Sequence, residues 1–344
     1  MIMLALSAMV GTSKVMTPYL TDLAHRDDTG RFQHLASHLL LTTGTPTNWG
    51  QLADSVPSTL GLAKANALQP YELDIDKVTR LNSENLHSLD YSELWQALGV
   101  KDASFHIEVR TLFQLSIELI SNSTQGSDRV YEFEITASKS GLPISTRLHS
   151  YVVLKDFVNE TMSSTSSDGV GTFEIGIPNS INGTTLLLVF AQATVNPQMV
   201  SLGAHSFGHN SDNPLPNGTF ARLSPLDYVL NATFNYTTVE VSKAQVFTFS
   251  YNFSLSVRTQ GVQTAEYSIP RLLDASPMVM VLTGVNGSTS FAEFVAYPQA
   301  PLQIGADFNE SIASSRIAVY RHAVTINSAL YEVVTNWGGL SNNV

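Results

Sequence analysis

The sequence of 344 residues contains no cysteine. This absence excludes disulfide bonds, thiolate metal sites and cysteine nucleophiles together. Charged residues are also scarce at 14%, and acidic residues outnumber basic ones, which gives a formal net charge of −11. Nucleic-acid binding needs clustered Lys and Arg, so this composition argues against a nucleic-acid partner. With 43% hydrophobic residues the chain can still build substantial cores, and its length allows two or three domains.

Recognisable catalytic motifs are absent as well. There is no GxSxG elbow, no phosphate-binding glycine loop and no dinucleotide fingerprint. Two histidine pairs with a spacing of four, His34 with His38 and His205 with His209, could each hold a cation, but neither belongs to a HExxH pattern. Surface positions on a helix and in a solvated loop explain them better. We therefore expect no catalytic residue, no cofactor and no metal, and a protein that is not an enzyme.

Asn-x-Ser/Thr sequons are abundant, and none occurs before Asn122. About four would be expected by chance for this composition. Thr-rich strands could produce some of them by accident. The other interpretation is a glycosylated extracellular head on an unglycosylated base. The nine sequon asparagines are Asn122, Asn159, Asn182, Asn217, Asn231, Asn235, Asn252, Asn286 and Asn309.

The first segment is apolar from Met1 to Val10 and then carries apolar residues at steps of three and four as far as Leu40. This spacing predicts an amphipathic helix over residues 1–43, with Pro18 either at its first helical position or at a kink. The opening apolar run is too short to span a bilayer alone. Its apolar face would pack against other subunits. The predicted assembly residues are Met1, Ile2, Leu4, Leu6, Met9, Val10, Val15, Met16, Tyr19, Leu20 and Leu23.

A compact and mostly helical connector is expected over residues 44–103. Asp74 can cap a short helix. Asp90 and Glu93 form a capping box, which predicts a helix that begins there and ends at Gly99.

From Phe105 the period changes to two, which predicts one long strand over residues 105–119. Short strands at regular spacing follow as far as Phe190 and are typical of a β-sandwich. Residues 201–218 are expected to form a loop. The alternation over residues 247–257 predicts that Tyr251 and Phe253 belong to the core and not to a sugar-binding surface. A hairpin turning at residues 327–328 closes the chain.

These patterns together predict a mainly β protein, with a β-sandwich head, a small helical connector and a long N-terminal helix. The expected domains are the helix (1–43), the connector (44–103), a β-sandwich head (104–125 plus 197–344) and an inserted Ig-like sandwich (126–196).

Several stretches resemble archaeal type IV pilin-like surface proteins, which carry class III signal peptides. The stretches are residues 39–50, 60–64, 71–78 and 91–100, with the closing hairpin of residues 319–333. Residues 141–190 are similar to the Ig-like or carboxypeptidase-regulatory type of sandwich. Family members carry a Glu near the mature N-terminus, whereas the first Glu here is Glu72. The resemblance implies a secreted subunit whose N-terminal segment packs with copies of itself or holds the protein in a membrane.

The expected function is therefore a structural subunit of an extracellular filament or cell-surface assembly, a homo-oligomer of copies of this chain. A membrane is the other partner that the N-terminal segment could take. The alternatives are a membrane-anchored adhesin or carbohydrate-binding surface protein, and a secreted hydrolase.

Overall fold

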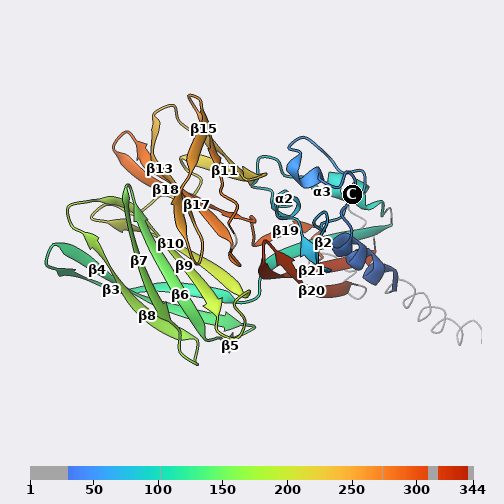
Figure 1. Cartoon of the computed structure of the whole chain (residues 1–344), viewed down its shortest axis with the longest axis horizontal. Helices are drawn as coiled ribbons and strands as arrows, with labels where there is room; N and C mark the ends of the chain where they lie inside the picture. The colour runs from blue at the N-terminus through green and yellow to red at the C-terminus, as the bar shows by residue number, and fades with distance from the viewer. Residues whose placement is uncertain (1–29, 101, 273, 309–316, 340–344) are drawn as a thin grey trace, which may run out of the picture.

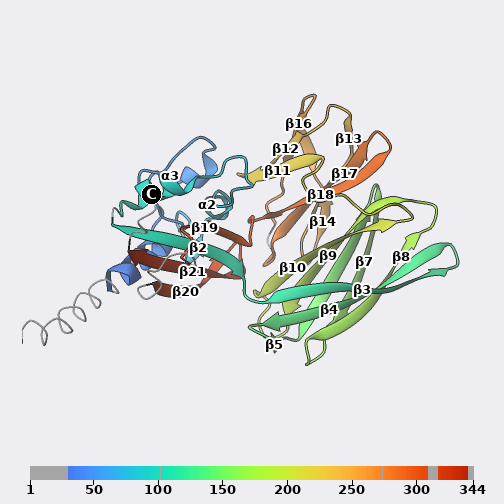
Figure 2. The ribbon, with the colours of Figure 1, turned by 180° about the vertical axis from the view of Figure 1, so that it is seen from behind.

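The computed structural model describes residues 30–100, 102–272, 274–308 and 317–339. In Figures 1 and 2 these residues form three modules, a mixed base at one end of the molecule and two β-sandwiches that lie side by side. We call them the base (residues 30–111 and 298–339), the first sandwich (114–209) and the second sandwich (220–297). The chain leaves the base once, builds both sandwiches in succession and returns to it.

A five-stranded sheet forms the centre of the base. A helix over residues 30–41 packs on one face through Phe32, Ala36, Leu39 and Leu40, and the Phe32 ring stacks on Trp337 with centroids 6.4 Å apart. The sheet order is β1 (Glu72–Leu73), β20 (Ala318–Ile326), β21 (Ala329–Gly339), β2 (Ala103–Thr111) and β19 (Leu302–Gly305), with β1 parallel to β20 and the other pairs antiparallel.

The sequence predicted a long N-terminal helix over residues 1–43, and this part of the predicted fold class is wrong. In the described part of the chain the helix covers only residues 30–41. It ends there because Gly44 takes a positive φ of 68° and Thr45 then pairs with Thr59, which turns the backbone across the base. The predicted assembly residues, all between Met1 and Leu23, lie outside the described residues.

The sequence predicts a mostly helical connector, but most of the segment after this helix is irregular. Short helices lie at the two predicted places, α2 (Ile75–Thr79) and α3 (Tyr91–Leu98), and a short 3-10 helix that was not predicted, η1 (Trp49–Gln51), precedes them. Asp74 caps α2 by accepting from the N–H groups of Asp76 and Lys77. Asp90 and Glu93 form the predicted capping box of α3, which ends at Gly99 with φ 67°. No helix among the described residues is long and apolar enough to cross a membrane.

The first sandwich packs two sheets around a core that includes Phe133, Phe173 and Phe207. The expected strand over residues 105–119 is divided, because the chain bends at Leu112 and Phe113 and its second half leaves the base sheet. One sheet contains β3 (Gln114–Gln125), β4 (Asp128–Lys139), β5 (Leu142–Pro143) and β8 (Val170–Pro178). The other has the order β10 (Val200–His209), β9 (Gly183–Ala193), β6 (Thr146–Leu154) and β7 (Phe157–Ser164).

Both sheets extend beyond the range expected for the inserted sandwich. β3 pairs with β4 along its whole length, and β10 pairs with β9 from Val200 to His209. The sandwich therefore includes strands on both sides of residues 126–196. The loop that was predicted over residues 201–218 is wrong for its first half, which is strand β10.

The second sandwich also has two four-stranded sheets. One has the order β11 (Ala221–Leu226), β12 (Val229–Phe234), β16 (Thr264–Ser268) and β15 (Ser256–Gln260). The other has the order β14 (Asn252–Ser254), β13 (Val239–Phe247), β17 (Met278–Asn286) and β18 (Thr289–Tyr297).

The predicted burial of the strand after Phe247 is wrong in part. Phe247 is fully buried, but the chain turns at residues 248–251 and then forms edge strands in both sheets, first β14 and then β15. Tyr251 and Phe253 are consequently 47% and 45% exposed. An edge strand has a neighbouring strand on one side only, so regular alternation does not guarantee burial there.

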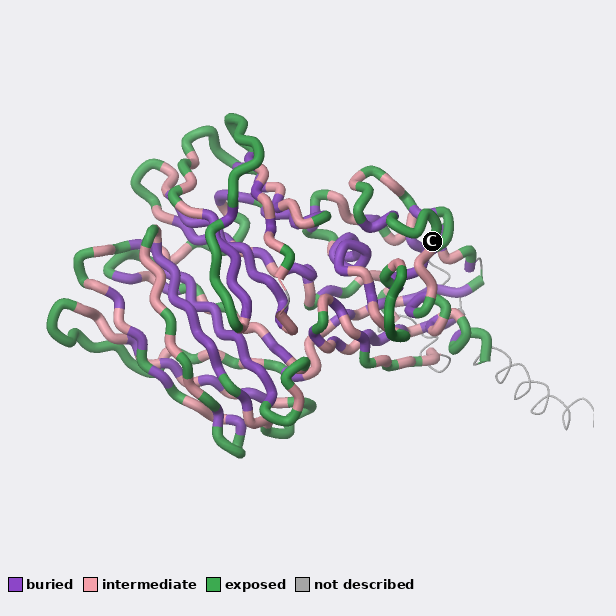
Figure 3. Tube along the Cα trace, viewed as in Figure 1, coloured by how far each residue is buried: buried purple, intermediate pink, exposed green. Residues whose placement is uncertain are grey.

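The two central strands of one sheet of the first sandwich, β6 and β9, are buried on both faces (Figure 3). On one face, Leu187 and Val189 contribute to the first sandwich's core. On the other, Leu188 and Phe190 pack with Phe247 and Val279 of the second sandwich. The two sandwiches therefore share a continuous apolar interface.

This two-sided burial predicts that neighbouring leucines on β9 contribute about equally to stability. Leu187→Ala and Leu188→Ala should each lower the free energy of unfolding by about 2–5 kcal/mol, because each leaves a cavity in a different core. Urea unfolding measures both values. Leu215→Ala, at an exposed side chain, is the control and should change stability by less than about 0.5 kcal/mol. A near-neutral Leu188→Ala would show that the sandwiches are not docked through this face.

Candidate functional sites at the junctions of the modules

The two histidine pairs considered as cation sites lie in different surroundings. His34 and His38 are exposed on the helix over residues 30–41. Among the described residues, no group of three or more His, Asp or Glu side chains is arranged to hold a metal ion.

His205 and His209 both lie on β10. His209 is fully buried, and its Nδ1 lies 2.8 Å from the Tyr131 hydroxyl, while its Nε2 lies 3.1 Å from the carbonyl oxygen of Pro178. Burial lowers the pKa of both histidines. These contacts assign His209 to the packing of the first sandwich.

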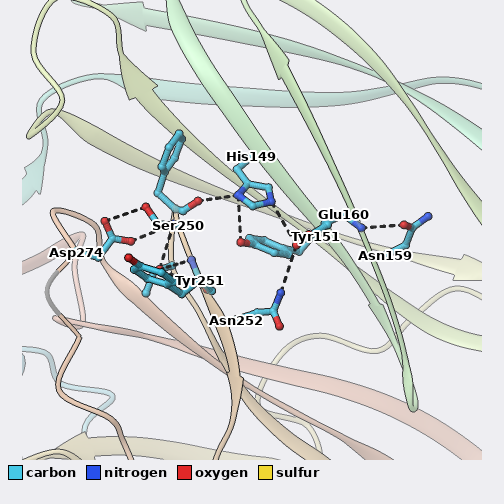
Figure 4. A network of polar contacts seen from close by, with 10 residues as sticks. His149, Tyr151, Asn159, Glu160, Ser250, Tyr251, Asn252 and Asp274 are labelled. Carbon is cyan, nitrogen blue, oxygen red and sulfur yellow. Dashed lines mark hydrogen bonds and ion pairs between the residues drawn. The ribbon is translucent and has the colours of Figure 1, made fainter.

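The most elaborate polar cluster lies between the two sandwiches (Figure 4). His149, on β6, is only 3% exposed. Its Nδ1 lies 2.7 Å from the carbonyl oxygen of Phe249 and 3.1 Å from the Tyr151 hydroxyl. Its Nε2 faces the Glu160 carboxylate at 3.4 Å. Glu160, on β7, also accepts a hydrogen bond of 3.3 Å from the Asn252 side chain of β14.

The turn that supplies the Phe249 carbonyl is itself held by several hydrogen bonds. The Asp274 carboxylate accepts from the Ser250 N–H at 3.0 Å, and the Ser276 hydroxyl accepts from the Phe249 N–H at 3.0 Å. The Thr248 hydroxyl accepts from the N–H groups of Ser250 and Tyr251. The turn is therefore fixed before Tyr251 and Phe253 emerge on the surface.

A histidine beside a tyrosine and a carboxylate is a combination used in acid–base catalysis. Here, however, the imidazole is covered by Tyr151 and Phe249, with ring centroids 4.2 Å and 6.2 Å away. A general base must reach the proton of a bound substrate. The cluster therefore fits the role of a polar link between sandwiches better than that of a catalytic site.

A second junction joins the base to the second sandwich through Asp76 of α2, which is 1% exposed. Its Oδ1 accepts hydrogen bonds from the Tyr297 hydroxyl at 2.5 Å and from the Asp227 N–H at 2.8 Å. Burial raises the pKa of Asp76 to about 6, although both donors act in the opposite direction, and the nearby carboxylates of Asp74 and Asp227 raise it further.

Two more buried charges on or next to α2 flank the Trp49 ring. Lys77 and Arg80 lie 5.9 Å and 5.6 Å from its centroid and are 0% and 2% exposed. Lys77 Nζ donates to the carbonyl oxygens of Thr43 and Ala63, both at 2.8 Å. Arg80 donates to the carbonyls of Trp49, Leu52, Ala53 and His87. Desolvation lowers the pKa of both cations.

Sequence reasoning missed these residues, because charged side chains are normally assigned to the surface. The capping pattern located α2 but gave no signal that Asp76, Lys77 and Arg80 would all be buried. Their partners are mostly backbone carbonyls of an irregular segment, which no side-chain motif reveals.

The cavities at the junctions are open and polar in part. One of about 390 Å³ lies between the base and the second sandwich and is lined by Glu84, Asn217, Arg222, Asn235 and Gln299 among others. Arg222 donates to the backbone carbonyls of Ser83, Glu84 and Asn85. Its guanidinium therefore holds the base loop against β11.

Comparisons with known proteins assign no family. No family model matches the sequence, and no curated protein matches it significantly. Among solved structures, HBP35 of Porphyromonas gingivalis is 12% identical with a TM-score of 0.19, over 55% of this chain and 64% of that one. Human GIVD cytosolic phospholipase A2 is 9% identical with a TM-score of 0.17, over 69% and 33%. The FN1–FN3 domains of chicken CNTN1 are 9% identical with a TM-score of 0.16, over 57% and 89%.

The chain thus spans less than two thirds of HBP35 and about a third of the phospholipase. At these TM-scores the likeness supports no assignment of fold family or function.

The raised pKa of Asp76 predicts a stability that depends on pH. Between about pH 3.8 and pH 6 the folded chain holds a proton that the unfolded chain has released. The contribution of protonated Asp76 to stability is therefore fully present below about pH 3.8 and is lost as the pH rises through 6. Asp76→Asn keeps an oxygen acceptor without the charge. It should raise the free energy of unfolding at pH 7 by up to about 3 kcal/mol.

Urea unfolding at about pH 4.5 and pH 7 measures this difference. Asp54→Asn, at an exposed carboxylate, should keep the pH dependence of the parent protein. If Asp76→Asn destabilises the protein at both pH values, the ionised carboxylate itself is required at this junction.

Proposed function

We propose that this protein is a non-enzymatic structural subunit of an extracellular filament or cell-surface assembly. The observation that supports this best is the connection of the three modules. The sandwiches share an apolar core, and Asp76 joins the base to the second sandwich through two short hydrogen bonds. Such continuous burial suits a rigid part that bears load, whereas enzymes of this size usually keep a concave apolar pocket with convergent polar groups.

The positions of the two ends of the molecule also support an assembly role. Residue 30, where the described chain begins, lies in the base, and the turn between β3 and β4 lies at the opposite end of the molecule (Figure 1). In this proposal the apolar segment of residues 1–23 joins subunits to one another or to a membrane. The sandwiches then face solvent and carry the glycans. The resemblance of residues 39–100 to archaeal type IV pilin-like proteins is consistent with this arrangement.

Deletion of residues 1–23 tests the assembly role. The shortened protein should remain folded, because the base and both sandwiches have extensive hydrophobic cores built from described residues. It should also sediment as a monomer. Under conditions in which electron micrographs show filaments of the full chain, the shortened protein should form none. Filaments or membrane association that persist without residues 1–23 would refute the role of this segment.

A second candidate function is a carbohydrate-binding surface protein, and the exposed aromatic pair supports it. The rings of Tyr251 and Phe253 stack with centroids 5.9 Å apart and an angle of 27° between their planes. They extend from a turn that hydrogen bonds already fix. Exposed aromatic rings on a rigid element lose little entropy when a ligand covers them.

A glycan array tests this second candidate. If the aromatic pair is a binding platform, the protein should bind at least one pyranose-containing glycan, and Tyr251→Ala with Phe253→Ala should weaken binding by about 10-fold or more. Val262→Ala removes an apolar side chain that is even more exposed, elsewhere on the same sandwich, and should leave binding unchanged. Absence of any bound glycan would count decisively against this function.

A further inference from the structure

The side-chain amides of the sequon asparagines fall into two groups in the structure. In the first group the amide nitrogen Nδ2 donates a hydrogen bond within the protein. In the second group the hydrogen bonds to other described residues involve only the amide oxygen Oδ1, as an acceptor. Asn309 lies outside the described residues. The asparagines of the first group are Asn159, Asn217, Asn231, Asn235 and Asn252. Those of the second are Asn122, Asn182 and Asn286.

Asn235 and Asn217 show what the first group does. Asn235 Nδ2 donates to the carbonyl oxygens of Gly218 and Thr219, at 3.2 Å and 2.7 Å, so both of its hydrogens are used. Asn217 pairs with the backbone of Phe294, donating to its carbonyl and accepting from its N–H, both at 2.9 Å. Asn217 holds the loop before β11 on the edge strand β18, and Asn235 holds it on the end of β12. A sugar on Asn235 would remove one of its two hydrogen bonds, because a glycosylated amide nitrogen keeps only one hydrogen.

Asn122 and Asn182 have the opposite orientation, which their partners impose. Arg129 donates to Asn122 Oδ1 from Nε at 3.0 Å and from Nη2 at 2.6 Å. Lys155 Nζ donates to Asn182 Oδ1 at 3.2 Å. Arginine and lysine have no acceptor, so the oxygen must face them and the nitrogen must face away. Both asparagines are exposed.

Asn286 is half-buried at the end of β17, and its Oδ1 accepts from the Thr238 hydroxyl. Gly287 follows it with φ 63°, so the sequon lies in the turn to β18. Its Nδ2 donates no hydrogen bond to another described residue, which distinguishes Asn286 from the asparagines of the first group.

The three sequons of the second group also lie at one end of the molecule. Asn122 precedes the β3–β4 turn, which Figure 1 places farthest from the base. Arg129 links that turn to Asn210, and Asn210 donates to the carbonyl of Asn179 in the connection that carries Asn182. Next to Asn182, Thr184 makes two hydrogen bonds of 2.9 Å to Ser290, just after the β17–β18 turn that carries Asn286. The turns of both sandwiches therefore meet at this end.

We infer that Asn122, Asn182 and Asn286 are the N-glycosylation sites of the described chain, and that their glycans form a cap over the end of the molecule opposite to the base. The inference rests on the proposed extracellular location. In each modification Nδ2 attacks the anomeric carbon of a lipid-phosphate-linked oligosaccharide, forms the N–C bond and loses a proton. The anomeric C–O bond breaks, and its electron pair leaves on the lipid phosphate. The glycans add a hydrated polar layer to a protein in which only 14% of residues are charged.

Glycopeptide mass spectrometry of the full chain, made by cells that possess N-glycosylation, tests the inference. Glycan should be found at Asn122, Asn182 and Asn286 and not at Asn159, Asn217, Asn231, Asn235 or Asn252. The substitutions N122Q, N182Q and N286Q should each remove the mass of one glycan. Occupancy of the second set, occupancy spread over both sets, or no glycan on any of the eight would overturn the inference.

A second measurement on unglycosylated protein from a bacterial host checks the structural basis. N235A should lower the melting temperature by about 2–4 °C, because two backbone carbonyls lose their donor. N182A, whose nitrogen makes no such bond, should leave it unchanged. Equal effects would contradict the division into two groups. The occupancy pattern does not depend on filament formation, so failure of the assembly role and failure of this inference give different results.

Discussion

The burial of both faces of β6 and β9, the two central strands of their sheet, is the constraint on which the remaining structure depends. A strand with no wet face must have apolar residues in succession, as β9 has from Leu186 to Ala191. Any displacement of the second sandwich would expose Leu188 and Phe190 to water. The apolar interface therefore fixes the distance between the sandwiches, and the His149 cluster at its edge adds directional contacts that fix their orientation.

Helix α2 fixes the arrangement of the base, and it does so through buried charges instead of apolar packing. Buried charges are tolerated only when they are fully hydrogen-bonded, since their desolvation costs several kcal/mol. Lys77 and Arg80 obtain their acceptors from carbonyls of residues 43–63 and 87, so this irregular segment must hold one conformation. Asp76 obtains its donors from the second sandwich. The charges thus specify how the segment and the sandwich are placed on α2.

Much of the local structure could be predicted from the sequence, but few of the junction residues could. The caps at Asp74 and Asp90 and the turn at Asn327 and Ser328 depend on neighbours a few residues away, and all were confirmed. The sites at the junctions depend on partners far along the chain. Asp76 and Tyr297 are 221 residues apart, and His149 and Phe249 are 100 residues apart. Periodicity carries no information about such pairs.

By itself, the sequence determined the class of the protein: a mainly β chain without disulfides or a recognisable catalytic motif, with its sequons confined to the strand-rich part. Those properties follow from composition and short-range patterns. Only the tertiary structure decided which alternating segment is buried, as the exposed Tyr251 in a turn and Phe253 on an edge strand illustrate, and which sequon asparagines donate from their nitrogen to other described residues. Both depend on what lies across from a residue in space, because burial and hydrogen bonding are satisfied by neighbours from other strands.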